Sequence, residues 1–381
     1  MAKSEKPGKA KPEPKRRSPL WARLCAILGC VLMVLSGGAI ITSQALVARY
    51  AGAVKQETLF EAPEGEEKEP VSDIKGPVNI LLVGIDPRDE NSAPLSDSII
   101  VVHIPAGLRQ AYLFSIPRDL RVEIPPFPQA GFQGSTERIN AAMSYGSRLG
   151  NGKFDAAQGF ALLAKTVGKL TGIKKFDAGA IINFHGFKDI VDAMGGVTMT
   201  IDQDVKSEHL KPNGKPRDRR PECADHSCEH PYIGPQAEYK KGTYHLEGWQ
   251  ALDYVRQRYG LPRVDYDRQR HQQQFIKAMA EQALSKDVVT NPLKLDQVLR
   301  AAGDALIFDG NGHSVVDWGL ALRNLRSDDM ALVKLPGGAA NGGGPYIGEA
   351  LEPAANDFFA ALRDDSVAAF LVDNPSFLQK F

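Results

Sequence analysis

A run of 25 uncharged residues near the amino terminus, residues 24–48, is the feature that most restricts how this chain can fold. About 20 apolar residues in a helix are enough to cross the hydrocarbon core of a bilayer. Residues 1–23 carry eight lysines and arginines but only Glu5 and Glu13, and such a basic flank stays on the cytoplasmic side. We therefore expect a cytoplasmic tail at 1–23, a transmembrane helix at 24–48 and an extracytoplasmic remainder held at the cell membrane by this single span. A cleaved signal peptide is the alternative, although the apolar run is long for one.

The charge of the whole chain gives no sign of a nucleic-acid partner. Lysine plus arginine and aspartate plus glutamate number 46 each, so the formal net charge is zero, whereas nucleic-acid binding domains are usually basic. Residues 49–76 are acidic and show little apolar periodicity. This composition predicts a solvated linker between the membrane and a folded domain.

Short apolar runs rich in β-branched residues begin at Val78. Continuous rather than alternating apolarity is typical of strands that are covered on both faces, as in an α/β domain. The predicted strands lie at 78–85, 98–104, 110–116, 178–184 and 197–202, and the predicted helices at 154–172, 185–196, 246–255 and 267–285. We expect residues 286–381 to form a carboxy-terminal extension packed on the same domain.

Two cysteines, Cys223 and Cys228, lie in a polar loop at 206–235 that we expect outside the membrane. Thiols in such an oxidising compartment usually pair, so we predict a disulfide bond between them. The neighbouring His226 and His230 allow a metal-binding alternative, but their spacing matches no standard zinc motif.

Five arginines fall in one short segment that starts at the end of the helix predicted at 246–255. They are Arg256, Arg258, Arg263, Arg268 and Arg270. Guanidinium groups so close together repel one another unless an anion or carboxylates lie between them. On a helix, Arg268 and Gln272 would share a face that continues into Phe275 and Met279, and guanidinium forks suit phosphate oxygens. This segment would suit a phosphate joined to a long apolar chain; a solvated basic helix paired with nearby acidic residues is the alternative.

Acidic residues at predicted strand ends form a second candidate site. Asp86 follows one strand and Asp97 lies at the start of the next, so their carboxylates could meet at one edge of the sheet and hold Mg²⁺ beside a substrate phosphate. The alternative is that both only cap turns. Arg118 and Asp119 follow a third strand and Arg138 precedes a helix start, in loops of the kind where sites are usually built.

Seven segments, taken in order, resemble blocks of the LytR–CpsA–Psr family of membrane-anchored cell-wall transferases. They are NILLVGIDPR, SDSIIVVHI, FSIPRDL, RINAAMSYG, INFHGFKDIVDAMGGV, HLEGWQALDYVRQR and DYDRQRHQQQ. The resemblance covers residues 78–284. It implies a mixed β-sheet flanked by helices, in a catalytic domain at 77–285, with a hydrophobic pocket for a polyprenyl chain.

The resemblance also implies an activity, the transfer of a glycopolymer from a polyprenyl-pyrophosphate carrier to peptidoglycan with formation of a phosphodiester. Asp86 and Asp97 would hold Mg²⁺, or Mn²⁺ in its place, and Asp119 or a metal-bound carboxylate would take the proton of the sugar hydroxyl. The residues expected at the pyrophosphate oxygens are Arg88, Arg118, Arg138, Arg256, Arg258, Arg268 and Gln272. Those expected nearest the chemistry are Arg118, Asp119, Arg256 and Arg258.

Two positions depart from the family pattern. Leu95 stands where an arginine usually precedes Ser-Asp, and His271 stands where the family often has arginine. Leu95 would remove one phosphate contact, for which Arg88 would compensate. His271 would make its position sensitive to pH, because imidazole titrates near neutrality.

Two other functions would use the same residues. One is hydrolysis of the carrier with water as acceptor, and the other is a non-enzymatic anchored protein that binds anionic lipid or wall polymer. The paired aspartates favour an enzyme over a plain anion-binding site, because carboxylates beside a phosphate help only where a metal lies between them. The polymer itself stays open among a teichoic acid, a capsule, an arabinogalactan-like polymer and a protein glycan.

Overall fold

The computed structural model describes residues 54–60, 73–86, 92–223, 228, 230–283, 291–341 and 345–379. The predicted cytoplasmic tail, the predicted transmembrane helix and most of the predicted linker lie outside these ranges, as does Arg88. Within them, no helix is both long enough and apolar enough to cross a bilayer. The fold described below belongs to the compact unit Tyr50–Phe381.

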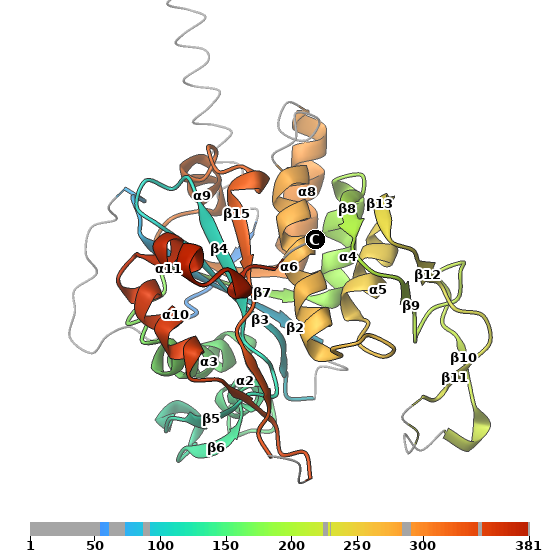
Figure 1. Ribbon diagram of the computed structural model, residues 1–381, viewed down its shortest axis with the longest axis horizontal. Coiled ribbons are helices and arrows are strands. Elements are labelled where there is room, and N and C mark those ends of the chain that lie inside the picture. The colour runs from blue at the N-terminus through green and yellow to red at the C-terminus, as the bar shows by residue number, and fades with distance from the viewer. Residues whose placement is uncertain are drawn as a thin grey trace, which may run out of the picture. The chain divides into compact units, whose positions relative to one another are not determined.

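A central sheet of seven strands runs through the described residues (Figure 1). In spatial order these are β1 (Lys55–Gln56), β14 (Leu306–Asp309), β7 (Ala178–Asn183), β2 (Val78–Ile85), β3 (Ser96–Ile104), β4 (Ala111–Ser115) and β15 (Met330–Val333). Strand β3 is antiparallel to β2 and β4, whereas β7 is parallel to β2 and β15 is parallel to β4. The sheet is therefore mixed, as the resemblance implied. The carboxy-terminal part of the chain supplies β14 and β15 to the sheet itself.

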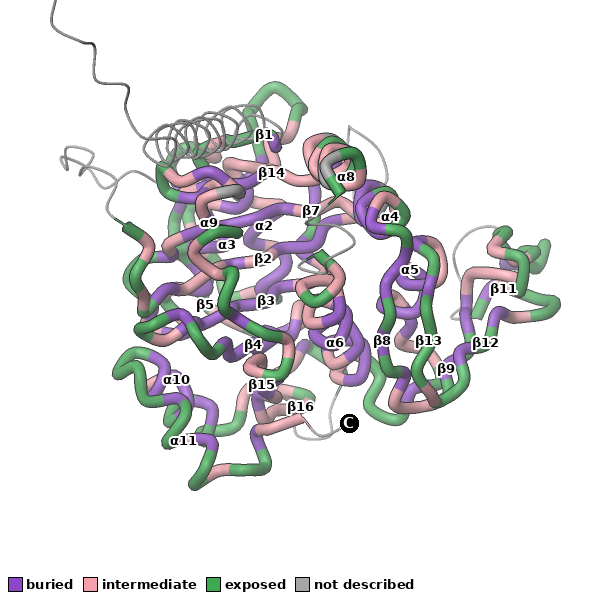
Figure 2. Tube along the Cα trace, turned by 90° about the horizontal axis from the view of Figure 1, so that it is seen from above, coloured by how far each residue is buried: buried purple, intermediate pink, exposed green. Residues whose placement is uncertain are grey.

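Both faces of the sheet are covered by helices, which explains the continuous apolarity of its strands. Because side chains alternate along a strand, Leu81 and Val101 point to one core and Ile100 and Val102 to the other. The first core includes residues of α2 (Asn140–Gly146), α3 (Ala156–Thr171), α10 (Ala354–Arg363) and α11 (Val367–Asp373). The second includes residues of α6 (Asp265–Ala283), α8 (Pro292–Ala305) and α9 (Val315–Ala321). Figure 2 shows the extent of burial along β2, β3 and β4.

Helix α3 shows how local chemistry sets element boundaries. Asp155 is its N-cap and accepts a hydrogen bond of 2.8 Å from the backbone N–H of Gln158, which satisfies one of the free donors of the first turn. The helix ends at Gly172, whose φ of 76° is a left-handed conformation that glycine adopts without steric cost. Leu163 and Val167 are fully buried between these ends, and the helix predicted at 154–172 is confirmed.

A third core lies beside the sheet, where α4 (Phe184–Ala193) and α5 (Gly248–Arg256) pack with α6 and the antiparallel pair β8 (Val197–Ile201) and β13 (Gly242–Leu246). The chain between β8 and β13, residues 202–241, projects to the right in Figure 1 and is called the insert from here on. Its short elements are β9 (Val205–Lys206), β10 (Asp218–Arg219), a 3₁₀ turn at Pro221–Cys223, β11 (Tyr232–Ile233) and β12 (Glu238–Tyr239). Two further pairs are β5 (Arg121–Ile124) with β6 (Ser135–Arg138) and β16 (Gly337–Ala339) with β17 (Glu349–Leu351).

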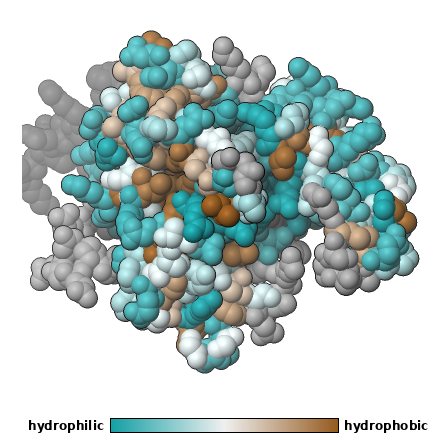
Figure 3. Space-filling model, turned by 60° about the horizontal axis from the view of Figure 1, so that its bottom comes forward, coloured by the Kyte–Doolittle hydropathy of each residue, from teal (hydrophilic) through white to brown (hydrophobic). Residues whose placement is uncertain are grey.

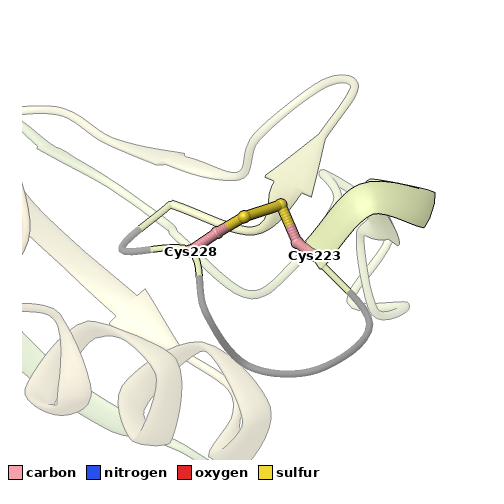
Figure 4. The surroundings of a disulfide bond; sticks show 2 residues. All are labelled: Cys223 and Cys228. Atoms are coloured by element: carbon pink, nitrogen blue, oxygen red, sulfur yellow. A yellow bond between two sulfur atoms is a disulfide. The ribbon is translucent and has the colours of Figure 1, made fainter.

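The cysteine prediction is confirmed. Cys223 and Cys228 are joined by a disulfide bond in the insert, with their Cα atoms 5.4 Å apart (Figure 4). Of the alternative metal ligands, His226 lies outside the described residues. Among the residues that are described, no group of three or more histidine, cysteine, aspartate or glutamate side chains could hold a metal ion.

Candidate functional site

Two aspartates meet at one edge of the central sheet. Asp86 directly follows Ile85, the last residue of β2. Asp97 falls at an irregularity in the β2–β3 ladder, since Ile85 pairs with Ser96 whereas Gly84 pairs with Ser98. An irregularity of this kind adds a residue to one strand and re-aims its side chain. Asp86 and Asp97 therefore lie at the same edge of the sheet, which is the arrangement predicted from the sequence.

Arginines from the loop that follows β4 and from the end of β6 reach this edge. Arg118 donates a hydrogen bond from Nη1 to Oδ1 of Asp97, and its Nε lies 3.6 Å from Oδ2 of Asp119. Oδ1 of Asp119 accepts a hydrogen bond of 3.3 Å from Nη1 of Arg138. Both carboxylate oxygens of Asp119 therefore face guanidinium groups.

The arginine segment approaches from the opposite side. Arg256, the last residue of α5, donates 2.7 Å from Nη2 to Oδ2 of Asp86. On α6, Nη2 of Arg268 lies 2.6 Å from Oδ1 of Asp265 and donates to the backbone carbonyl of Asp97 at 3.3 Å. Four residues later, Gln272 accepts 2.9 Å from the hydroxyl of Ser98. The face that Arg268 and Gln272 share, as predicted from their spacing, is therefore turned toward the start of β3.

Four of the five arginines of the segment divide into two groups. Arg263 and Arg270 both pair with the buried Asp267, at 2.8 Å and 2.9 Å, and Arg270 also lies 2.7 Å from Asp202. These two arginines follow the alternative interpretation, in which acidic neighbours neutralise a basic helix. Arg256 and Arg268 are turned to the sheet edge instead.

Burial and charge set the electrostatics of the site. Burial lowers the pKa of Arg268, and the positive charges of Arg118 and Arg258 lower it further, while Asp265 and Asp97 oppose this change. Burial also acts to lower the pKa of Arg118, but the negative charges of Asp97, Asp119 and Asp265 outweigh it and raise that pKa. The positive charges of Arg118 and Arg258 therefore act on Arg268, and a bound anion would relieve this repulsion.

Two of these guanidinium groups have unused hydrogen-bonding capacity. The Nε atoms of Arg118 and Arg268 are buried and have no hydrogen-bond partner within the described part of the chain. A buried charged donor that lacks an acceptor is costly. Phosphate oxygens would supply such acceptors, because they match the planar guanidinium fork.

The aspartate pair fits a divalent cation. The side chains of Asp86 and Asp97 are 27% and 19% exposed, so both are accessible at the edge of the site. Mg²⁺ usually takes one or two carboxylates and completes its shell with substrate phosphates and water. Asp86 and Asp97 could therefore hold Mg²⁺ together with a phosphate substrate, in competition with the arginines that now pair with them.

Several residues of the site carry no local sequence signal. The backbone N–H of Glu349 donates 2.8 Å to the carbonyl of Asp119, and its carboxylate accepts from Tyr266 at 3.1 Å and from Tyr346 at 3.0 Å. His209 of the insert experiences the charges of Arg256 and others at the site. These residues come from parts of the chain that only the tertiary fold brings to the sheet edge.

The two departures from the family pattern have different surroundings. Leu95 is 42% exposed. His271 is fully buried, its ring is stacked on Tyr254 at 4.4 Å, and its Nε2 lies 3.6 Å from Asp202. Burial lowers the pKa of His271 although Asp202 opposes this change. Protonation of His271 would therefore first disturb the packing of α6 around this buried ring.

Comparison with known proteins identifies the family. A model of the LytR_cpsA_psr family matches residues 45–364. With most of the chain matched, and with the mixed sheet and the arginine–aspartate site in place, the chain belongs to the LytR–CpsA–Psr family.

Individual relatives agree with this assignment. The cell wall biosynthesis protein LcpA of Corynebacterium glutamicum is 28% identical over 298 residues, which cover 71% of this chain and 52% of LcpA. The polyisoprenyl-teichoic acid–peptidoglycan teichoic acid transferase TagV of Bacillus subtilis is 30% identical over 233 residues, which cover 60% of this chain and 49% of TagV. The chain thus spans about half the length of these curated relatives. The crystal structure of B. subtilis TagV shares the fold, with a TM-score of 0.54 and 22% identity over 77% of this chain and 98% of that one.

Proposed function

We propose that this protein is a membrane-anchored phosphotransferase that moves a glycopolymer from a polyprenyl-pyrophosphate carrier to peptidoglycan and forms a phosphodiester. One observation carries the proposal, namely that Arg118 and Arg268 present buried Nε donors without acceptors beside Asp97. A pyrophosphate would provide the acceptors. The relative TagV, named as a polyisoprenyl-teichoic acid–peptidoglycan teichoic acid transferase, supports the same reaction class.

The reaction requires little covalent chemistry from the protein. The hydroxyl oxygen of the acceptor attacks the phosphorus that bears the sugar polymer, and the bond from that phosphorus to the bridging oxygen breaks. Polyprenyl phosphate leaves, and the hydroxyl proton passes to a carboxylate or to solvent. Catalysis of phosphoryl transfer relies mainly on positioning and on stabilisation of charge. Arg118, Arg256 and Arg268 would bind the pyrophosphate oxygens and stabilise the charge that develops on the leaving phosphate.

A divalent cation would complete the site. Asp86 and Asp97 would hold Mg²⁺, or Mn²⁺ in its place, and the ion would neutralise phosphate charge. Arg256 and Arg118 pair with these carboxylates, so the ion would compete with them and favour their contact with the substrate. The predicted span at 24–48 would place this site on the extracytoplasmic side of the cell membrane, where peptidoglycan lies.

The direct test is release of polyprenyl phosphate from a polyprenyl-pyrophosphate sugar by the full chain, with and without Mg²⁺ and with and without peptidoglycan fragments. We expect metal-dependent turnover and sugar on the acceptor, both lost in Arg256→Ala and Asp97→Ala. Arg300→Ala, at an arginine that is 72% exposed on α8, serves as control. Turnover without labelled acceptor would favour a hydrolase, and tight lipid binding without turnover would favour an anchored binding protein.

A further inference from the structure

A buried polar cluster fixes the insert to the end of α5. Asp253, which is 5% exposed, accepts hydrogen bonds from the hydroxyl of Ser207 at 2.9 Å, from the hydroxyl of Tyr239 at 2.7 Å and from Nε2 of Gln257 at 2.7 Å. Oε1 of Gln257 in turn accepts 2.8 Å from the backbone N–H of Glu208. Gln257 lies between Arg256 and Arg258 in the chain. The insert is therefore held in a defined position relative to the arginines of the site.

Aromatic rings line the boundary between the insert and the arginine segment. The guanidinium of Arg258 lies 4.9 Å from the centre of the Tyr259 ring, and the ring of His230 meets Tyr259 edge-on at 4.8 Å. Within the insert, the rings of His209 and Tyr232 are 5.5 Å apart. All four rings are at least partly exposed. The set His209, His230, Tyr232 and Tyr259 is called the aromatic strip below. Figure 3 shows hydrophobic groups among hydrophilic ones on the insert, at the right of the view.

Within the strip, His209 adds contact surface without adding charge. Burial lowers the pKa of His209 to about 4, and the positive charges of Arg256, Arg258 and Arg217 contribute to this change, with Asp86 opposing it. At neutral pH the imidazole is therefore uncharged and offers one hydrogen-bond donor and one acceptor. Glu208 lies 3.6 Å from Arg217 and 3.4 Å from His230, and its Oε1 is buried without a hydrogen-bond partner among the described residues. An uncharged group next to the phosphates would suit this surface.

We propose that the aromatic strip binds the sugar ring joined to the pyrophosphate, so that the insert selects the lipid-linked polymer by its first sugar. Aromatic rings with polar tips are amphipathic, and they can pack against the C–H bonds of a sugar while neighbouring polar groups bind its hydroxyls. The inference rests on the proposed function. Arg258 connects the two subsites, because its guanidinium lies 4.9 Å from the centre of the Tyr259 ring and its charge acts on the buried Arg268.

The other two groups of the reaction fit the strip less well. A polyprenyl chain would need an apolar surface, which rings with polar tips do not provide. The acceptor attacks from the side opposite the leaving polyprenyl phosphate, so its binding site need not lie beside Arg258. The first sugar is attached directly to a phosphate, so it must lie next to the phosphate-binding arginines.

The test compares two soluble probes, geranyl pyrophosphate and geranyl-pyrophosphoryl-glucose, by calorimetric titration of the full chain in detergent with Mg²⁺. We expect the wild-type protein to bind the glucose-bearing lipid roughly five- to tenfold more tightly, the range that one aromatic contact supplies. Tyr232→Ser should abolish this preference without changing the affinity for geranyl pyrophosphate. Tyr232→Phe should retain it, because the ring remains.

Matched controls separate the outcomes. Tyr244→Ser removes an aromatic ring that is 42% exposed on β13, outside the strip, and should keep the preference. A preference that survives in Tyr232→Ser, a wild-type protein that has none, or an equal loss of affinity for both probes in Tyr232→Ser would overturn the inference and leave the proposed function standing. Failure of the wild-type protein to bind either probe would overturn the proposed function and the inference with it.

Discussion

Arg256 donates a hydrogen bond of 2.7 Å from Nη2 to Oδ2 of Asp86, a residue 170 positions earlier in the chain. The pair connects the end of α5 to the end of β2. Its side chains are 37% and 27% exposed, so ligands can reach both. The carboxylate of Asp86 competes with phosphate for Arg256. In the same way, the guanidinium of Arg256 competes with metal for Asp86. Metal bound to Asp86 would therefore remove a competitor of phosphate for Arg256, so the two ligands would assist each other at this pair.

Asp86→Asn should tighten the binding of pyrophosphate in the absence of metal and weaken Mg²⁺-dependent turnover. Loss of a partly exposed ion pair removes competition of about 1 kcal/mol, which is about fivefold in affinity. Calorimetric titration with inorganic pyrophosphate in EDTA measures this change. Asp189→Asn, at an aspartate that is 65% exposed on α4, should leave the affinity unchanged. Weaker metal-free binding in Asp86→Asn would contradict the competition described here.

The division of the arginines predicts different effects of one conservative substitution. Arg268→Lys should reduce turnover about tenfold or more, because lysine keeps the charge but lacks the planar fork that binds phosphate in a bidentate way. Arg263→Lys, at a side chain that pairs with Asp267 and is 40% exposed, should change turnover less than about twofold. Steady-state kinetics on the lipid-linked sugar decide between them. Equal losses at the two positions would show that the arginines act as one group.

We expect the buried hydrogen bonds of Asp253 to make a large contribution to the free energy of unfolding. Asp253→Asn places an amide N–H₂ among three donors, so we expect the free energy of unfolding to fall by about 2–3 kcal/mol. Ser207→Ala removes one of these bonds and should cost about 1 kcal/mol. Denaturant titration measures both values. Asp218→Asn, at an insert aspartate that is 68% exposed, is the control. If Asp253→Asn lowers the free energy of unfolding as little as the control does, the cluster has no structural role.

Acid should destabilise the protein through His209. Its pKa is lowered from 6.5 to about 4 by burial and by Arg256, Arg258 and Arg217, so the unfolded chain binds more protons than the folded chain between these two values. Stability is therefore full above about pH 6.5 and declines as the pH falls toward about 4. The loss should approach about 2 kcal/mol for a partly exposed group.

His209→Gln should flatten this part of the pH profile, measured as the free energy of unfolding at several pH values. His313→Gln, in the loop before α9, should preserve the wild-type slope. If the slope between pH 6.5 and 4 stays the same in His209→Gln, the decline belongs to other groups, of which the buried His271 is the first to examine because burial lowers its pKa as well.

Local patterns were sufficient for most of the elements and for part of the site. The strand predicted at 78–85 agrees with β2, and the helix predicted at 267–285 corresponds to α6 at Asp265–Ala283. Strand ends and helix faces have short-range signatures, so Asp86, Asp97 and Arg268 could be proposed together. The predicted loop at 206–235 proved to be part of a structured insert, because its short strands pair over too few residues to leave a periodic signal.

The sequence by itself determined the α/β class, the disulfide and the family, since hydrophobic period, cysteine pairing and ordered motifs are properties of neighbouring residues. Only the tertiary structure decided which arginines are turned to the sheet edge. Arg263 and Arg270 meet Asp267, which lies three or four residues from them in the chain, so this part of the pairing follows from helix spacing. Arg270 also meets Asp202, Arg256 meets Asp86 and Arg268 meets the start of β3. The physical reason is that a charge is neutralised by groups that lie near it in space, and these last three partners come from strands and loops far away in the chain, which no local pattern records.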